Sequence, residues 1–558
     1  DPTQFLMENG WFDLAEENGE CLFVLAPGSG GWGSVEEELP FLTAALSWLN
    51  TPVADEADPN APDKNKNYWS AFGEWYFVGY GEGCAPLEAW SAKNPIFVIA
   101  KVYLNGVSAG AAYLSEVGTN GYDITEDVKS RLAARGDQMI TNQDIPVPTW
   151  FVNYDAADHS LQYWKTANDC SPSGTQNADY GTVYVQAGDS DAWQTQYAGP
   201  ISKVAVDSRQ SLSGREIHDF LTCYTRYDNT SAYGNALMLR GDYTDVIVNA
   251  HKSPDRYAEQ KVTMPDGATA TMICTIVDIE GEPREILFYI PDNASELQPD
   301  GAPVITVWAG GSQTNIIFFD STCWWETANQ NGIALIFTNE AYNTSVAVTP
   351  ADVDACYHAM LDLLEGWNDS GKFQFDLSRI YSTGQSMGSM ESQQFAQETP
   401  DYYAAVASTS FYQDYPDAHS DKPIPTYLIN GEGNGKDDTG TPYDDRWNRT
   451  DDWAQYFLRV NGFVYTPAVY AADGTVTTFG VPVSEPVFTV TGPYDRFETY
   501  TWINGQDIPL VQYTNSLYRP HNCLTSEIPM LWDFLEHYRC ERDEDGAVTA
   551  RYYSASAF

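Results

Sequence analysis

Residues 379–390 read Arg-Ile-Tyr-Ser-Thr-Gly-Gln-Ser-Met-Gly-Ser-Met, and this stretch decides the fold. An apolar run enters the pattern Gly-x-Ser-x-Gly between Gly384 and Gly388, and a segment of helical character follows. A strand, a strained turn and a helix in this order raise the hydroxyl of the central serine above the carboxyl end of a sheet. The stretch therefore predicts an α/β fold with a nucleophile at Ser386.

A second stretch, residues 75–83, has the same form but lacks the serine. It reads Trp-Tyr-Phe-Val-Gly-Tyr-Gly-Glu-Gly, so Gly81 stands where Ser386 stands in the later stretch. Three further pairs of segments match in the same order along the chain: residues 11–19 match 324–332, residues 147–153 match 424–430, and residues 218–221 match 532–535. Such self-similarity predicts two tandem domains of one type, residues 1–240 and 241–558, of which the first is catalytically dead.

Both halves alternate strands with helices, which predicts mostly parallel sheets with helices on both faces. The second half begins with apolar strands at residues 269–276 and 284–290 that the first half lacks, because Trp11 lies almost at its start. A sheet without its first strands exposes an edge, so we expect the natural chain to extend upstream of Asp1 or to be a trimmed product. A strand-rich insertion is expected at about residues 464–500.

Composition limits the class of partner. The chain has 558 residues, too many for one core, and 29 basic residues against 78 acidic ones give a formal net charge of -49. Such a surface repels nucleic acid and anionic membranes, and no apolar run is long enough to span a membrane. The nine cysteines contain no C-x-x-C pair and so predict no zinc site. We expect a secreted, extracellular protein.

A serine hydroxyl becomes a nucleophile when a base removes its proton and a carboxylate orients that base. In this type of fold the acid follows the strand after the turn, and the histidine comes last. His521 lies on the loop before the closing helix and is therefore the predicted base. We favour Asp438 as the acid, with Asp437 and Glu432 as alternatives on the same loop.

The negative charge that develops during acyl transfer needs two backbone N–H groups. Met387, directly after the nucleophile, is expected to supply one, and Gly311, in the glycine loop at 309–312, the other. Residues 106–110 also match Gly-x-Ser-x-Gly, but Ser108 follows the next strand along and is expected to be structural. The first half lacks a nucleophile and has no histidine where the base belongs, so we expect no catalysis from it.

Several motifs of the second half occur together: Gly-Gly-Ser-Gln at 310–313, residues 318–332, Asp-Leu-Ser-Arg-Ile-Tyr-Ser-Thr-Gly-Gln-Ser-Met-Gly at 376–388, Pro-Asp-Tyr-Tyr-Ala-Ala-Val at 400–406, Pro-His at 520–521 and Trp-Asp-Phe-Leu at 532–535. Because of this set of motifs, residues 260–558 resemble the polyhydroxybutyrate-depolymerase-like esterases of the α/β-hydrolase superfamily, a group that includes feruloyl esterases. The resemblance implies cleavage of carboxylic esters through an acyl-enzyme, with no metal or organic cofactor. Two departures are Ala309-Gly310 in place of His-Gly and a longer acid loop. The first half resembles the same family weakly.

Aromatic side chains near the predicted site have two interpretations. Trp324, Trp325, Tyr500 and Trp502 either bind an aromatic or polymer-derived acyl group or belong to the core. We predict a secreted serine esterase acting on a small-molecule or polymeric ester, of polyester, feruloyl or acetyl type. An inactive surface or carbohydrate-binding protein and a serine peptidase are the alternatives, and the oligomeric state stays open.

Overall fold

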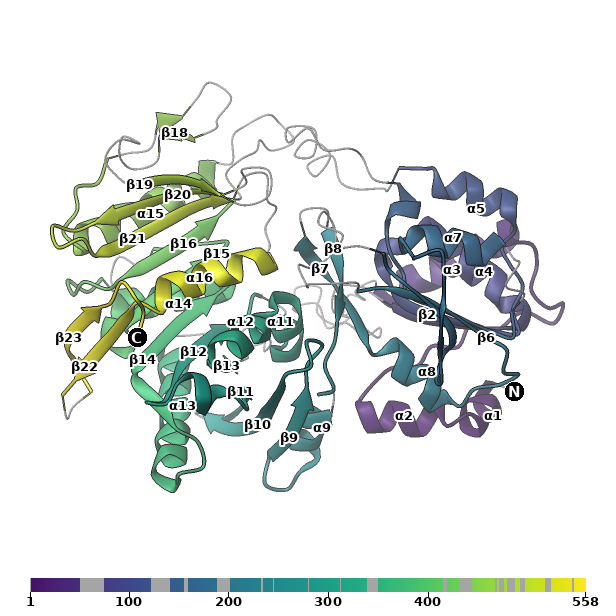
Figure 1. The fold of residues 1–558 in the computed structure, drawn as a ribbon, viewed down its shortest axis with the longest axis horizontal. Coiled ribbons are helices and arrows are strands. Elements are labelled where there is room, and N and C mark those ends of the chain that lie inside the picture. The colour runs from purple at the N-terminus through teal and green to yellow at the C-terminus, as the bar shows by residue number, and fades with distance from the viewer. Residues whose placement is uncertain are drawn as a thin grey trace, which may run out of the picture. The chain divides into compact units, whose positions relative to one another are not determined.

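The computed structural model describes residues 2–50, 75–121, 141–154, 159–187, 201–231, 234–243, 245–279, 281–311, 313–338, 350–414, 419–431, 444–466, 469–470, 476–478, 487–491, 497–516, 523–543 and 546–558. The chain divides into two compact units (Figure 1). The first comprises residues 1–129 and 137–248, and the second comprises residues 130–136 and 249–558. The predicted α/β fold class is confirmed, since each unit has a mixed sheet with a run of neighbouring parallel strands and with helices packed on it.

The first unit contains a six-stranded sheet. In order across the sheet its strands are β1 (Trp75–Tyr80), β2 (Val98–Leu104), β3 (Thr149–Val152), β6 (Lys203–Asp207), β5 (Gly181–Val185) and β4 (Thr175–Asn177). Its helices are α1 (Pro2–Glu8), α2 (Trp11–Asn18), α3 (Val35–Asn50), α4 (Cys84–Lys93), α5 (Ala111–Gly118), α7 (His159–Ala167) and α8 (Gly214–Leu221), with short 3-10 turns η2 (Gly81–Gly83), η3 (Pro95–Phe97) and η4 (Asn142–Asp144). A hairpin of β7 (Tyr224–Ser231) and β8 (Gly234–Leu239) follows, and α9 (Asp245–Lys252) crosses into the second unit.

The second unit contains an eleven-stranded sheet. In order across the sheet its strands are β19 (Val487–Thr491), β20 (Phe497–Ile503), β21 (Pro509–Ser516), β16 (Thr426–Asn430), β15 (Ala405–Thr409), β14 (Phe375–Gly384), β12 (Ala302–Trp308), β13 (Ala334–Thr338), β11 (Glu282–Pro291), β10 (Thr269–Ile279) and β9 (Tyr257–Thr263). Two hairpins lie outside it, β17 (Val469–Tyr470) with β18 (Val476–Thr478) and β22 (Tyr538–Arg542) with β23 (Val548–Tyr553). Of the strands in the predicted insertion, β19 and β20 thus extend the main sheet.

Helices of the second unit cover both faces of its sheet (Figure 1). They are α10 (Ala294–Leu297), α11 (Asn315–Thr322), α12 (Trp324–Asn331), α13 (Pro350–Ser370), α14 (Met387–Glu398), α15 (Asp444–Val460) and α16 (Ile528–Leu535), with the 3-10 turns η5 (Pro400–Tyr402) and η8 (Thr525–Glu527). Every residue of β12 and β13 is buried, which explains why these strands are continuous apolar runs rather than alternating ones. No helix in the described ranges is both long and apolar enough to cross a membrane.

Six strands have the same order and direction in both sheets. In the first, β1, β2, β3 and β6 are parallel neighbours, and β5 and β4 continue antiparallel. In the second, β14, β15, β16 and β21 are parallel neighbours, and β20 and β19 continue antiparallel. The second sheet goes on beyond β14 with β12 and β13, whereas among the described residues the first sheet ends at β1.

Candidate active site

The turn between β14 and α14 holds Ser386 in a strained conformation. Ser386 has φ 57° and ψ −115°, although a residue with a side chain avoids positive φ. Its N–H donates to the carbonyl of Thr409 on β15 at 3.3 Å, and the N–H of Met390 in α14 donates to its carbonyl at 3.1 Å. The serine is half-buried. Neighbouring elements on both sides therefore hold it at the start of the helix.

The two glycines of the motif allow this close packing. A Cβ placed on Gly384 would lie 2.2 Å from the carbonyl oxygen of Gly388. A Cβ on Gly388 would lie 2.0 Å from the carbonyl oxygen of Trp308, at the end of β12. Both distances are far below van der Waals contact, so a larger residue would push α14 away from β14 and β12. The close packing of α14 against β14 and β12 thus requires the two glycines of the motif.

The glycine loop after β12 lies against the start of α14. A Cβ on Gly311 would lie 3.9 Å from the Met387 sulfur, so the two predicted oxyanion donors are neighbours. The N–H of Gly310 donates instead to the Gln313 side chain at 2.9 Å. Helix α14 directs the positive end of its dipole to the same place. The role of Met387 and Gly311 as oxyanion donors stays a prediction.

The predicted base and acid lie outside the described residues: His521, Asp438, Asp437 and Glu432. The strands that precede them in the chain are described. The acid loop follows β16 and the histidine loop follows β21, and these two strands are parallel neighbours, paired from Thr426–Val511 to Asn430–Asn515. Since β14, β15, β16 and β21 all run in one direction, the carboxyl ends of β16 and β21 lie at the edge of the sheet where Ser386 follows β14.

The structure adds a buried carboxylate that the sequence did not single out. Glu527 in η8 is fully buried and accepts a hydrogen bond from the Thr409 hydroxyl at 2.9 Å. The same Thr409 accepts the N–H of Ser386 through its carbonyl. Glu527 therefore links η8 to the turn that holds Ser386. A glutamate in Thr-Ser-Glu before a helix looks like an ordinary first-turn residue, so the sequence offered no signal.

Three tryptophans predicted to bind substrate lie in the core. Trp324 and Trp325 are each 1% exposed and Trp502 is 5% exposed. Trp324 and Trp325 begin α12, and Trp502 packs near Tyr500 with ring centroids 6.4 Å apart. Burial of this degree fits the second interpretation, packing in the core, and substrate binding by these residues stays a prediction.

The first unit has a turn at the corresponding place, with Gly81 in the position of Ser386. Gly81 has φ 56°, against 57° for Ser386, and it also stands between a strand and a helix. Ser108 lies in a hydrogen-bond network with Ser160, at 2.7 Å, and the fully buried Glu88, at 3.3 Å. Burial is the main cause that raises the pKa of the Glu88 carboxyl. This network fits the structural role expected of Ser108.

Helices α2 and α12 also share their ends. Each has eight residues and follows a residue in the left-handed region, Gly10 at φ 75° and Cys323 at φ 54°. Each ends at a left-handed glycine, Gly19 at φ 66° and Gly332 at φ 69°, whose N–H caps the helix. The two helices can therefore be aligned residue by residue.

Within the described ranges, no three His, Cys, Asp or Glu side chains gather to hold a metal ion.

Of the comparisons with known proteins, only the one with solved structures found similar proteins. No family model and no curated protein matches the chain. An acetyl xylan esterase from Aspergillus awamori is 14% identical, covers 46% of this chain and 98% of its own, and has a TM-score of 0.32. A thermostable esterase is 16% identical, with 37% and 61% covered and a TM-score of 0.27. A ferulic acid esterase is 14% identical, with 25% and 57% covered and a TM-score of 0.22. The chain thus spans about three fifths of the last two structures.

Proposed function

We propose that the second unit is a serine esterase with Ser386 as its nucleophile. The observation that carries the proposal is the strained backbone of Ser386 at the N-terminus of α14. Strain at a residue with a side chain costs free energy and is found mainly at functional sites. A glycine would relieve it, yet the second unit keeps a serine there. The requirement for a hydroxyl at this point explains the strain.

In the proposed reaction His521 removes the proton of the Ser386 hydroxyl as its oxygen attacks the ester carbonyl, and Asp438 orients His521. The N–H groups of Met387 and Gly311 stabilise the tetrahedral oxyanion. The protonated His521 then gives its proton to the leaving alcohol, and an acyl-enzyme forms. Water, deprotonated by His521, releases the acid and restores the serine. The strands that precede Asp438 and His521 in the chain, β16 and β21, are parallel neighbours, and this supports the assignment.

The first unit is, in this proposal, a degenerate copy that performs no hydrolysis. The conserved strand order and the matching φ of Gly81 and Ser386 support common ancestry, and the absence of a hydroxyl at Gly81 removes the nucleophile. The formal charge of -49 supports a secreted protein. The acyl group is of polyester, feruloyl or acetyl type, which a panel of esters will distinguish.

Labelling with a fluorophosphonate probe tests the nucleophile. We expect one adduct on the folded protein, at Ser386 by peptide mapping, and none on Ser386→Ala. Ser108→Ala is the matched control, since Ser108 lies in the same sequence pattern but in a hydrogen-bond network. Its labelling and esterase rate should equal those of the unmodified protein. A folded protein that resists the probe would instead indicate an inactive binding protein.

The base and acid are tested by substitution and rate. His521→Ala should lower kcat by roughly a thousandfold or more. Among Asp438→Asn, Asp437→Asn and Glu432→Gln, one alone should lower kcat by about 10⁴, which identifies the acid. We expect it to be Asp438. Cleavage of peptides in preference to acyl esters would replace the esterase assignment by a peptidase.

A further inference from the structure

The turn that holds Ser386 is tied to the start of α16 through Thr409. The Ser386 N–H donates to the Thr409 carbonyl at 3.3 Å, and the Thr409 hydroxyl donates to the Glu527 carboxyl at 2.9 Å. Both Thr409 and Glu527 are buried. Glu527 stands directly before α16 and follows His521 by six residues in the chain. We call these two side chains the Thr409–Glu527 pair.

The strands on both sides fix the backbone of Thr409. It forms an isolated parallel bridge with Gln385, the residue before the nucleophile, and pairs with Ile429 of β16. Ser410 follows at φ 62°, and its N–H donates to the Ile429 carbonyl at 2.8 Å. The Thr409 and Ser410 hydroxyls are 3.5 Å apart. Because the Thr409 carbonyl binds the Ser386 N–H, a contact made by the Thr409 side chain also acts on the turn.

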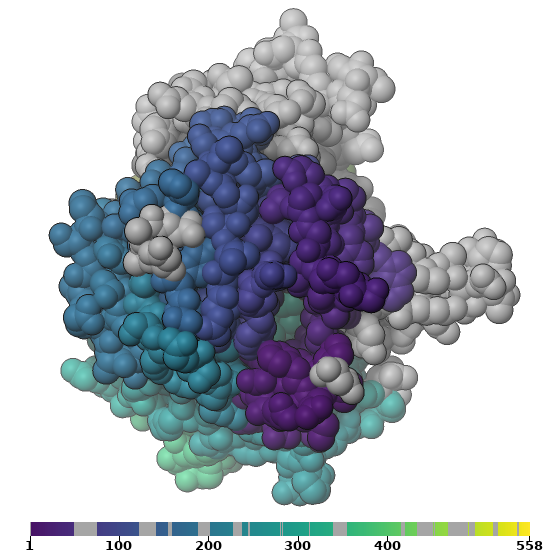
Figure 2. All heavy atoms as spheres, turned by 90° about the vertical axis from the view of Figure 1, so that its right-hand side faces the viewer, coloured from purple at the N-terminus to yellow at the C-terminus, as the bar shows by residue number. Residues whose placement is uncertain are grey.

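The first unit, whose atoms face the viewer in Figure 2, offers an internal comparison. In β1 and β2, the residue before the turn, Tyr80, pairs with Leu104. In β14 and β15, the residue before the turn, Gln385, forms its bridge with Thr409. Leu104 thus has the place of Thr409. Its side chain is apolar and buried, so it cannot donate a hydrogen bond.

The acceptor of the pair is also replaced in the first unit. Helices α8 and α16 have eight residues each, and residues 218–221 match 532–535 in sequence. Ser213 stands directly before α8, as Glu527 stands directly before α16. The Ser213 hydroxyl accepts the N–H of Glu216 and so caps its own helix. The unit with glycine in the turn therefore has neither the donor nor the acceptor of the pair at these two positions.

This comparison separates the pair from the requirements of the fold. In the first unit the strand and the helix form with leucine and serine at the two positions. Burial of a carboxyl group costs free energy unless the group is hydrogen-bonded, so the second unit gains no obvious stability from it. The pair occurs in the unit that has a serine in the turn, and Thr409 contacts that turn. Its role is therefore connected with the serine.

We propose that Thr409 and Glu527 are positioning residues for the esterase reaction, an inference that rests on the proposed function of the second unit. The pair holds the turn of Ser386 against the segment of chain that follows the proposed base, His521. In this role neither side chain of the pair touches the ester. Acyl transfer needs the serine oxygen and the base in alignment, and a displacement of about 1 Å can cost about a hundredfold in rate. Loss of the pair should accordingly lower kcat and leave KM unchanged.

Isosteric substitutions test the hydroxyl. Thr409→Val keeps the shape of the side chain and removes the donor, and it should lower kcat per folded molecule by roughly tenfold or more. Thr409→Ser keeps the hydroxyl and should restore most of the rate. Thr426→Val is the matched control, since Thr426, the first residue of β16, is also buried and its hydroxyl donates to Gln393 at 3.4 Å. The control should lower the free energy of unfolding without lowering kcat.

Substitutions of Glu527 test the acceptor. Glu527→Leu removes both acceptor oxygens and should lower kcat by about tenfold or more, whereas Glu527→Gln keeps one acceptor oxygen and should retain most of the rate. Thr409→Val combined with Glu527→Leu should lower kcat no further than the slower single variant, because the two side chains act as a unit. Thr409→Leu combined with Glu527→Ser copies the first unit. This variant should unfold cooperatively in urea and yet have the reduced kcat.

The outcomes distinguish this inference from the proposed function. An unmodified protein that neither hydrolyses esters nor reacts with a fluorophosphonate contradicts both. An active protein whose kcat is unchanged by Thr409→Val and by Glu527→Leu overturns the positioning role alone. Equal losses of kcat in Thr409→Val and Thr426→Val would mean that the pair only stabilises the fold. A higher KM at constant kcat would assign the pair to substrate binding, and either of these two results also overturns the proposal.

Discussion

Replacing Ser386 by glycine should stabilise the second unit while it removes the proposed nucleophile. At φ 57° and ψ −115° a residue with a side chain costs about 1–3 kcal/mol, which glycine avoids. Glycine also increases the conformational entropy of the unfolded chain, and this offsets about 0.5–1 kcal/mol of that gain. The expected net gain in the free energy of unfolding is about 0.5–2 kcal/mol.

Ser386→Ala separates this backbone effect from the loss of the hydroxyl. Alanine and glycine both lack the hydroxyl, but alanine keeps the Cβ that makes the conformation costly. We therefore expect Ser386→Gly to be more stable than Ser386→Ala by most of the net gain, with neither variant active. Urea unfolding, extrapolated to water, measures the difference.

Because the chain has two compact units, each unfolding transition must be assigned to one of them. Gly81→Ser provides the assignment, because Gly81 has φ 56° and a Cβ there would contact nothing within 4 Å. It should destabilise the first unit alone, by the torsional cost. If the glycine variant at 386 were no more stable than the alanine variant, Ser386 would not be strained, and the main support for the proposed function would be lost.

Two further predictions concern stability. Gly388→Ala should prevent native packing or lower the free energy of unfolding by more than about 3 kcal/mol, because its Cβ would lie 2.0 Å from the Trp308 carbonyl oxygen. Gly366→Ala in α13 is the control, since its Cβ would have open space and the change should stabilise the helix by about 1 kcal/mol. Urea unfolding of both variants tests the contrast. The hydrogen bond to Glu285 raises the pKa of His251 above its ordinary 6.5, so its stabilising effect is fully present below that value and is lost as pH rises through the raised pKa. Because His251 is 54% exposed, His251→Gln should cost less than about 1 kcal/mol near pH 6 and almost nothing near pH 9; an equal cost at both pH values would refute the linkage.

Local sequence patterns determined much of this protein. The Gly-x-Ser-x-Gly stretch predicted a strand, a turn and a helix, because Gly384 and Gly388 leave no room for a Cβ. The similarity of residues 11–19 to 324–332 corresponds to two helices that each end at a left-handed glycine, Gly19 and Gly332. Fully apolar runs predicted buried parallel strands, and these together made the fold class predictable. Each of these signals acts over a few neighbouring residues.

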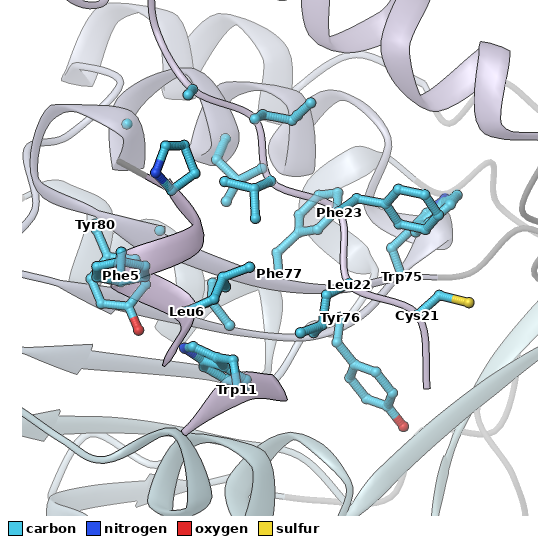
Figure 3. Close-up of a pocket in the computed structure, with 18 of the residues that line it drawn as sticks. Phe5, Leu6, Trp11, Cys21, Leu22, Phe23, Trp75, Tyr76, Phe77 and Tyr80 are labelled. Carbon is cyan, nitrogen blue, oxygen red and sulfur yellow. The ribbon is translucent and has the colours of Figure 1, made fainter. Parts of the chain in front are cut away.

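Other features depend on contacts between residues far apart in the chain, which no local pattern specifies. The hydrogen bond of Glu527 to Thr409 joins residues 118 apart, and a glutamate before a helix looks the same whether it is buried or solvated. The burial of Trp324 depends on which elements cover α12, so the sequence alone could not decide whether Trp324 packs in the core or binds substrate. The cavity beside β1 (Figure 3) is lined by residues 19–27 and by Trp75–Tyr80, two segments that are about fifty residues apart in the chain. Strand order is a property of the whole sheet, and only the tertiary structure decides it.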